Sequence, residues 1–141
     1  MKKVVLPSAL ILSLLSGCAV DQAIDRPTIF KSLTGIWDEE NPATCEFSRA
    51  LSFSDDGRTM TATFPETGYA SERDARKSFD YEILEVNESW LRMALLDEPR
   101  TDADGKAVVW ILKLIDEDIF CWGREDWQPY ECTPPRFRCD T

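Results

Sequence analysis

Histidine is absent from all 141 residues of the chain. Without it the chain lacks the general base of the usual catalytic triads and the commonest metal ligand of proteins. Paired carboxylates can act as an acid and a base, but the two acidic runs, residues 38–40 and 116–118, stand at the ends of predicted strands, where charge faces water. The sequence therefore predicts no catalytic residue, no enzyme activity and no cofactor.

Metal-binding patterns are also scarce. Residues 102–105 read Asp-Ala-Asp-Gly, like the opening of a calcium loop, but the later ligands and the distal glutamate of such a loop are missing. Asp-Gly is an ordinary turn sequence. We therefore interpret this segment as a turn and predict no metal site.

Long apolar segments are absent except near the N-terminus, where residues 4–15 follow Lys2 and Lys3. This run is too short to span a bilayer, which takes about 20 residues, but it has the length of the central region of a signal peptide. The chain has no second apolar run, no internal repeat and no low-complexity stretch. This pattern favours a single exported domain.

The four residues Leu15-Ser16-Gly17-Cys18 resemble the lipobox of bacterial lipoproteins. A cysteine thiolate is the nucleophile that can carry a diacylglyceryl thioether. The resemblance implies that residues 1–17 are removed as a signal peptide and that acyl chains on Cys18, palmitate among them, anchor the protein to a membrane. Ala19 implies the outer membrane, because enterobacterial lipoproteins retained in the inner membrane carry Asp at this position. The alternative is an ordinary secretory signal that happens to end at a cysteine.

Removal of residues 1–17 leaves 124 residues, enough for one domain with one core. Because Lys2 and Lys3 are lost, the net charge falls from −10 to −12. Such acidity disfavours nucleic acid and favours a basic protein as a partner. The alternative is that the acidity only keeps an exported protein soluble.

Four cysteines remain beyond Cys18, namely Cys45, Cys121, Cys132 and Cys139. An even number outside the cytoplasm predicts two disulfides. Zinc is the alternative, but the chain has no histidine and no Cys-x-x-Cys spacing. Of the three possible connectivities we favour the nested one, in which Cys121 bonds Cys132 across the last hairpin and Cys45 bonds Cys139 in the tail.

Residues 18–33 are predicted to be a tether that ends in a turn of helix, and residues 34–141 alternate between strands and turns. Asp56-Gly57 is taken as a two-residue turn, and a three-residue loop is centred on Asn87. These turns, with a loop at 97–107, set apolar residues opposite apolar residues. The predicted pairs are Leu51–Ala62 and Phe53–Met60; Phe79–Leu95, Tyr81–Met93, Glu82–Arg92 and Ile83–Leu91; and Leu91–Leu112, Met93–Trp110 and Leu95–Val108, with a last hairpin through residues 116–118.

An antiparallel meander with one apolar face must cover that face, and the only other helix candidate, residues 70–77, is short and polar. Closure into an all-β up-and-down barrel buries the face and removes the exposed strand edges. The inward side chains are mostly large, so we expect a filled interior with a shallow cavity near one mouth. The inward positions are Leu51, Phe53, Met60, Ala62, Phe64, Phe79, Tyr81, Ile83, Leu91, Met93, Leu95, Val108, Trp110, Leu112 and Leu114.

The segment Leu33-Thr34-Gly35-Ile36-Trp37, just before the first predicted strand, resembles the Gly-x-Trp signature of lipocalins and lipocalin-like barrels. In that family the tryptophan closes the narrow end of the barrel against an arginine of the last strand. The resemblance implies a lipocalin-like domain over residues 34–141, with Trp37 as the closing residue and Arg124, or Arg138, over its indole. The domain is shorter than a full lipocalin, and the other motifs of the family are not recognisable.

Two classes of function fit these features. The first is an envelope lipoprotein whose lipocalin-like barrel binds a small apolar molecule or lipid. The second is a protein-interaction module, for an envelope partner or as an inhibitor of a basic enzyme such as lysozyme, that acts through acidic loops. The segment at 127–130 lies outside the clear strands, so Trp127 and Tyr130 are the candidate contact surface.

Overall fold

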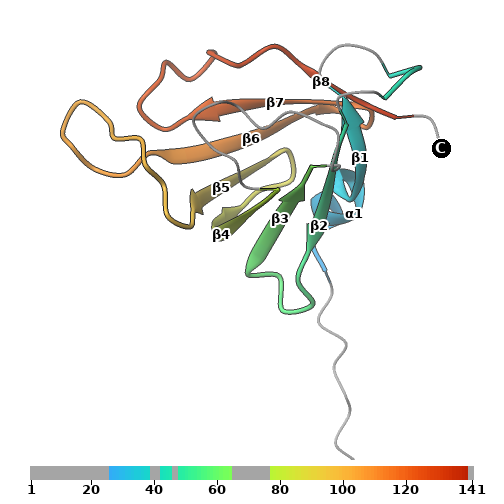
Figure 1. Ribbon diagram of the computed structural model, residues 1–141, viewed down its shortest axis with the longest axis horizontal. Coiled ribbons are helices and arrows are strands. Elements are labelled where there is room, and N and C mark those ends of the chain that lie inside the picture. The colour runs from blue at the N-terminus through green and yellow to red at the C-terminus, as the bar shows by residue number, and fades with distance from the viewer. Residues whose placement is uncertain (1–25, 39–41, 46–47, 65–76, 140–141) are drawn as a thin grey trace, which may run out of the picture.

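The computed structural model describes residues 26–38, 42–45, 48–64 and 77–139. Eight antiparallel strands close into a barrel in which each strand pairs with its neighbours in sequence and β8 returns to β1, as Figure 1 shows. The predicted all-β barrel is confirmed. The elements are α1 (Thr28–Leu33), β1 (Gly35–Asp38), β2 (Arg49–Phe53), β3 (Thr59–Thr63), β4 (Ser78–Val86), β5 (Trp90–Leu95), β6 (Val109–Asp116), β7 (Ile119–Arg124) and β8 (Arg136–Arg138).

The signal peptide, Cys18 and residues 70–76 of the polar helix candidate lie outside the described residues. In the part of the chain that is described, no helix is long and apolar enough to cross a membrane. The motif Gly35-Ile36-Trp37, which the sequence placed just before the first strand, forms most of β1 itself.

The strand register agrees with prediction in two of the hairpins that carry the apolar face. Leu51 pairs with Ala62 across β2 and β3, as predicted from the Asp-Gly turn. Met93 pairs with Trp110 across β5 and β6. In both hairpins, apolar side chains on one face meet apolar side chains on the next strand, which buries that face continuously.

The predicted register of the β4–β5 hairpin is wrong by two residues up to Ile83 and by three residues beyond it. A bulge between Ile83 and Glu85 adds one residue to β4, and the connecting loop is then residues 87–89. Up to Ile83 the apolar face survives, because a shift of two residues keeps each side chain on its original side. The observed pairs are Tyr81–Leu95, Glu82–Ala94, Ile83–Met93, Glu85–Arg92 and Val86–Leu91.

The barrel interior is filled, as expected. None of the fifteen positions predicted to point inward is exposed. Phe120 and Trp122 of β7 and Trp37 of β1 join them in the core. A dense core of this kind provides most of the stability of a small domain, at roughly 25 cal/mol for each Å² of apolar surface removed from water.

Helix α1 covers one end of this core. The sequence assigned it to the tether, but its side chains Ile29, Phe30 and Leu33 are buried in the barrel core. Phe30 stacks on Phe53 of β2, with ring centres 4.6 Å apart. At Gly57 a Cβ would lie 3.2 Å from the Phe30 ring, so a glycine in this turn lets the β2–β3 hairpin fold closely over the helix.

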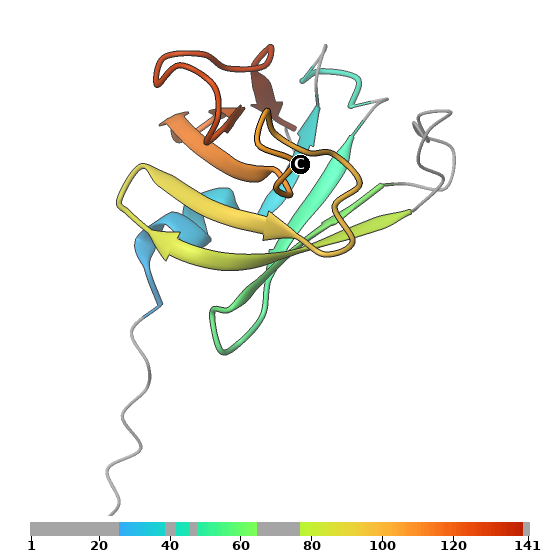
Figure 2. The same ribbon diagram turned by 90° about the vertical axis from the view of Figure 1, so that its left-hand side faces the viewer.

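The two ends of the barrel differ in their connections. The turns at the α1 end are short, at residues 54–58, 87–89 and 117–118, and Figure 2 shows α1 against the end that carries the β4–β5 turn. The longer connections follow β1, β3, β5 and β7 and lie at the opposite end. We call that opposite end the mouth.

The two disulfides have the predicted nested pairing. Cys45 bonds Cys139, with their Cα atoms 5.9 Å apart, and this bridge ties the β1–β2 connection to the end of β8. Cys121 bonds Cys132, with Cα atoms 5.8 Å apart, and holds the β7–β8 connection against β7. Both bridges therefore restrain connections of the mouth end.

Candidate ligand site at the barrel mouth

The α1 end of the barrel is closed by Trp37. Its side chain is fully buried, and its indole Nε1 donates a hydrogen bond to the carbonyl oxygen of Leu33 at 2.9 Å. The indole packs edge-on against Phe120 with ring centres 4.9 Å apart. The guanidinium carbon of Arg138 lies 4.2 Å from the centre of the indole ring. Trp37 thus joins α1, β1, β7 and β8.

Arg138 is the partner of Trp37, and Arg124 is not. β8 sets Arg138 directly opposite Trp37 in register. Arg124 ends β7 at the mouth, where it pairs with Asp126 at 2.7 Å and lies over the Trp127 ring at 5.5 Å. The prediction that Arg124 lies over Trp37 was therefore wrong, because the three-residue strand that carries Arg138 was not recognised in the sequence.

The geometry around Arg138 explains the glycine of the Gly-x-Trp motif. The guanidinium donates hydrogen bonds to the carbonyl oxygens of Ser32, Thr34 and Glu117, two of which belong to the end of α1. Gly35 has φ +142°, and a Cβ there would lie 2.9 Å from Nη1 of Arg138. Only glycine leaves room for the arginine at this conformation.

The mouth holds a cavity of about 230 Å³. The deep core side chains Leu51, Met60 and Leu112 are not among its described lining residues, so the cavity stops above the filled middle of the barrel. This agrees with the expected shallow cavity near one mouth, since drug-sized pockets occupy about 300–1,000 Å³. The lining residues are Arg49, Ala62, Phe64, Phe79, Tyr81, Arg100, Trp110, Trp122, Thr133 and Arg136.

Trp122 of β7 is the centre of the aromatic lining. Tyr81 stacks on it with ring centres 5.4 Å apart, and Trp110 meets it edge-on at 6.0 Å. Trp122 is only 4% exposed, and its Nε1 has no hydrogen-bond partner among the described residues. A buried donor without an acceptor costs about 1–3 kcal/mol.

Two of the arginines that line the cavity belong to the barrel strands. Arg49 begins β2 and pairs in register with Trp37, so it stands on the inward side of the strand. Arg136 begins β8, pairs with the core residue Phe120 and is 8% exposed. Strands from opposite sides of β1 therefore bring two positive charges to the same cavity.

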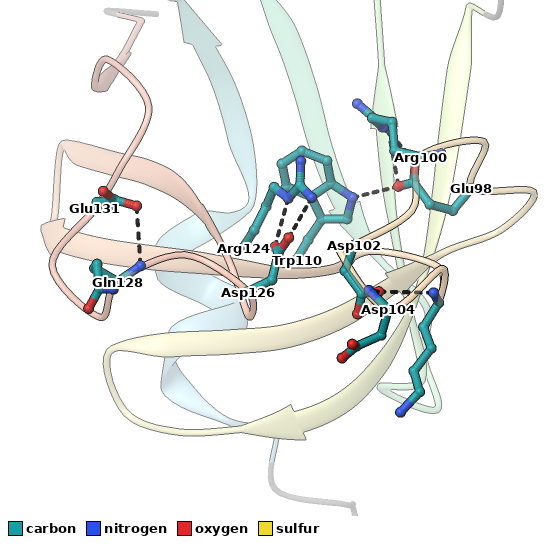
Figure 3. Close-up of polar contacts among 10 residues, drawn as sticks. Glu98, Arg100, Asp102, Asp104, Trp110, Arg124, Asp126, Gln128 and Glu131 are labelled. Carbon is teal, nitrogen blue, oxygen red and sulfur yellow. Dashed lines mark hydrogen bonds and ion pairs between the residues drawn. The ribbon is translucent and has the colours of Figure 1, made fainter.

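The third arginine, Arg100, comes from the β5–β6 connection and is balanced by a carboxylate. Its guanidinium makes two hydrogen bonds to Glu98, whose Oε2 also accepts a 2.6 Å bond from Nε1 of Trp110 (Figure 3). Burial acts to raise the pKa of Glu98, but the bonds from Arg100 and Trp110 outweigh it, so the pKa lies below its ordinary 4.5. The pair fixes the rim of the cavity and adds no net charge.

A second hollow, the outer groove, lies outside the barrel on β5, β6 and the β7–β8 connection. It has a volume of about 490 Å³ and includes Trp90, Ile111, Trp127 and Pro129. Trp127 is half-buried there, whereas Tyr130 beside it is 83% exposed. The two candidate contact residues are thus neighbours on one surface.

The acidic segments have structural roles or face solvent. The run at 116–118 is an exposed turn, as expected. Asp38, expected to face water, is instead fully buried at the end of β1, where it pairs with Phe137 of β8. Asp102 Oδ1 accepts backbone N–H bonds from Asp104 and Lys106, so this segment is a turn. No group of three possible metal ligands occurs within the described ranges.

Sequence reasoning identified Trp37 and the disulfide cysteines but missed Arg49, Trp122 and Arg136. Alternation from Leu51 puts Arg49 on the inward side, which was an available signal. Comparison with known proteins found no matching family model, no matching curated protein and no matching solved structure. The geometry of the mouth is therefore the basis for a functional assignment.

Proposed function

We propose that this chain is a lipid-anchored envelope protein whose barrel binds a small, compact ligand at its mouth. The observation that carries the binding proposal is the 230 Å³ cavity at the mouth, with its lining of Tyr81, Trp110 and Trp122. Its volume fits a molecule of one or two rings and is too small for the acyl chains of a lipid. A compact apolar ligand is therefore preferred over a lipid.

The lipobox supports the anchoring proposal. Cys18 stands eight residues before Arg26, where the described chain begins. Even fully extended, eight residues reach at most about 28 Å. Since α1 lies at the closed end, an anchor on Cys18 would hold the closed end near the membrane and leave the mouth toward the aqueous side.

The substitution Cys18→Ala tests the anchor. We expect the variant to leave the membrane fraction and to lack acyl mass on its N-terminal peptide, with the wild type fractionating with outer membranes. Wild-type protein that is soluble and carries an unmodified Cys18 would contradict the proposal.

Ligand binding is tested by filling the cavity. Ala62 lines it and is 2% exposed, whereas Ala50 is exposed on the same hairpin and serves as the matched control. Native mass spectrometry of the purified protein should show a bound small molecule in the wild type and in Ala50→Leu, but not in Ala62→Leu. Overpacking costs about 1–3 kcal/mol, so circular dichroism must confirm that Ala62→Leu is folded. The same bound mass in all three proteins would contradict binding at the mouth.

Protein interaction is the second candidate function, and the outer groove beside the exposed Tyr130 favours it. The mature net charge predicts a basic partner. A photo-crosslinking residue at position 130 should capture one such protein in intact cells, and the same probe at the exposed Glu88, at the α1 end, should not. The absence of any adduct specific to position 130 would exclude this use of the surface.

A further inference from the structure

Residues 85–89 read Glu-Val-Asn-Glu-Ser and lie at the end of β4 and in the turn that follows it. Asparagine followed by a residue other than proline and then by serine or threonine is the acceptor sequence of N-linked glycosylation. An acidic residue two positions before the asparagine is the further feature that bacterial oligosaccharyltransferases use. The chain has one other asparagine, Asn41, and proline follows it. We propose that Asn87 is a site of N-linked glycosylation.

The acceptor sequence lies on the surface of the folded domain. Every residue from 84 to 89 is exposed. The turn belongs to the α1 end of the barrel (Figure 2), so a sugar attached there would leave the cavity at the mouth open. A glycan is bulky and hydrated, and an exported protein therefore carries it on its surface. Position 87 meets that requirement without any change of fold.

Asn87 shapes the turn through groups that the modification does not use. Its backbone N–H donates a hydrogen bond to the carbonyl oxygen of Trp90 at 2.9 Å, and its side-chain Oδ1 accepts one from the backbone N–H of Ser89 at 3.4 Å. The side-chain nitrogen Nδ2 carries two further N–H groups. Among the described residues, neither this nitrogen nor the Ser89 hydroxyl has a hydrogen-bond partner. Both polar groups of the acceptor sequence are thus available to a transferase.

The modification joins the amide of Asn87 to a sugar that is carried on a polyprenyl pyrophosphate lipid. The Nδ2 atom attacks C1 of the sugar, and the new N–C1 bond forms as the bond from C1 to the pyrophosphate oxygen breaks. The pyrophosphate leaves with the electron pair of the broken bond, and the amide loses one proton to a base of the transferase. Nothing is oxidised or reduced, so the lipid-linked sugar is the one co-reactant.

The surroundings of Asn87 leave room for a sugar. A shallow hollow of about 730 Å³ lies beside it, between the hairpin turn and the start of α1. Val86 borders this hollow and is an exposed apolar residue. A first sugar that lies in the hollow would cover this apolar surface, which favours its packing against the protein.

The same hollow connects the acceptor with the proposed lipid anchor. Pro27 and Thr28 border it together with Asn87. Pro27 follows Cys18 by nine residues, and the extended chain between them reaches at most about 32 Å. An anchor on Cys18 would therefore hold Asn87 near a membrane, where a lipid-linked sugar donor and its transferase are found.

A purely structural role for Asn87 is the competing explanation. Asparagine is common in tight turns because its side-chain oxygen binds the backbone two residues on, as it does here. Aspartate offers the same oxygen but has no amide nitrogen. Asn87→Asp therefore keeps the turn and removes the acceptor of the sugar, so the two explanations differ in what this variant loses.

Peptide mass spectrometry of the full-length protein, purified from its native cells, tests the proposal. Trypsin releases residues 78–92 as one peptide whose only asparagine is Asn87. We expect this peptide to carry the added mass of one or more sugar residues, and we expect Asn87→Asp and Ser89→Ala each to abolish that mass. Ser89→Thr keeps the hydroxyl and should retain it. Asn41→Asp makes the same change at the other asparagine and should also retain it.

Circular dichroism should show that Asn87→Asp is folded, because the turn keeps its side-chain acceptor. An unmodified peptide 78–92 in the wild-type protein would overturn the proposal. Sugar that persists in Asn87→Asp would place it on another side chain, such as the Ser89 hydroxyl, and would also overturn the proposal. The N-terminal peptide of the same preparation reports the acylation of Cys18 separately, so a failure of the anchoring proposal is distinguishable from a failure of this one.

Discussion

Replacing Trp37 by alanine is the sharpest test of how the barrel is closed. Truncating a buried tryptophan costs about 3–5 kcal/mol. The change also leaves the buried Leu33 carbonyl oxygen without its donor, which adds about 1–3 kcal/mol. The stacking contact with Arg138 is worth a further 0.5–2 kcal/mol or so. Since small domains have a total stability of about 5–15 kcal/mol, we expect Trp37→Ala to be largely unfolded or close to unfolding at room temperature.

The measurement is urea unfolding of the mature protein with its disulfides intact, followed by far-ultraviolet circular dichroism. Trp127→Ala is the control, because Trp127 is only half-buried and lies in the outer groove. We expect the control to lose no more than about 1 kcal/mol. Equal and small losses at both positions would mean that Trp37 does not close the barrel and that the Gly-x-Trp resemblance is accidental.

A double-mutant cycle isolates the part played by Arg138. Trp37→Phe and Arg138→Gln, singly and together, should show a coupling energy of about 0.5–2 kcal/mol if the guanidinium stacks on the ring. A coupling energy near zero would refute the contact even if both single variants are destabilised.

Two further predictions concern the bridges and the rim. The Cys45–Cys139 bridge closes a separation of 94 residues, and the Cys121–Cys132 bridge closes one of 11. Replacing the first pair by alanine should therefore lower the free energy of unfolding by about 4–5 kcal/mol, and replacing the second pair by about 3 kcal/mol. The reverse order in urea unfolding would contradict the loop-entropy reasoning. The pKa of Glu98 is lowered on folding, so its carboxylate stabilises the protein above its ordinary pKa of 4.5, and that contribution is lost as pH falls through the folded value. Glu98→Gln should therefore lower the urea midpoint more at pH 7 than at pH 3. Equal losses at both pH values would show that the negative charge of Glu98 does not contribute to stability.

The fold was largely predictable because its local signals agree with one another. An Asp-Gly turn and the alternation of Leu51 and Phe53 define the β2–β3 hairpin without reference to the rest of the chain. The β4–β5 hairpin was not predictable in detail, because a register shift of two residues leaves the hydrophobic pattern unchanged. A bulge at Leu84 has no signal of its own in the sequence, and only packing against the neighbouring strands selects between the two registers.

The site was less predictable than the fold, because it depends on closure. Arg49 and Arg136 are 87 positions apart in the chain, and each reads in isolation as a charged residue at the edge of a strand. They face one cavity only because β2 and β8 both pair with β1. The same closure brings Arg138, rather than Arg124, to Trp37.

The polar groups at the two ends of the barrel therefore affect the stability of the protein in opposite ways. At the α1 end the indole N–H of Trp37 has its acceptor, and Arg138 binds the carbonyl oxygens that end the helix. At the mouth the indole N–H of Trp122 has no acceptor among the described residues. This buried donor lowers the stability of the free protein, whereas a ligand bound in the mouth cavity should raise it. A ligand at a hundred times its dissociation constant stabilises a folded protein by about 2.7 kcal/mol, so binding at the mouth predicts a melting temperature that rises with ligand concentration.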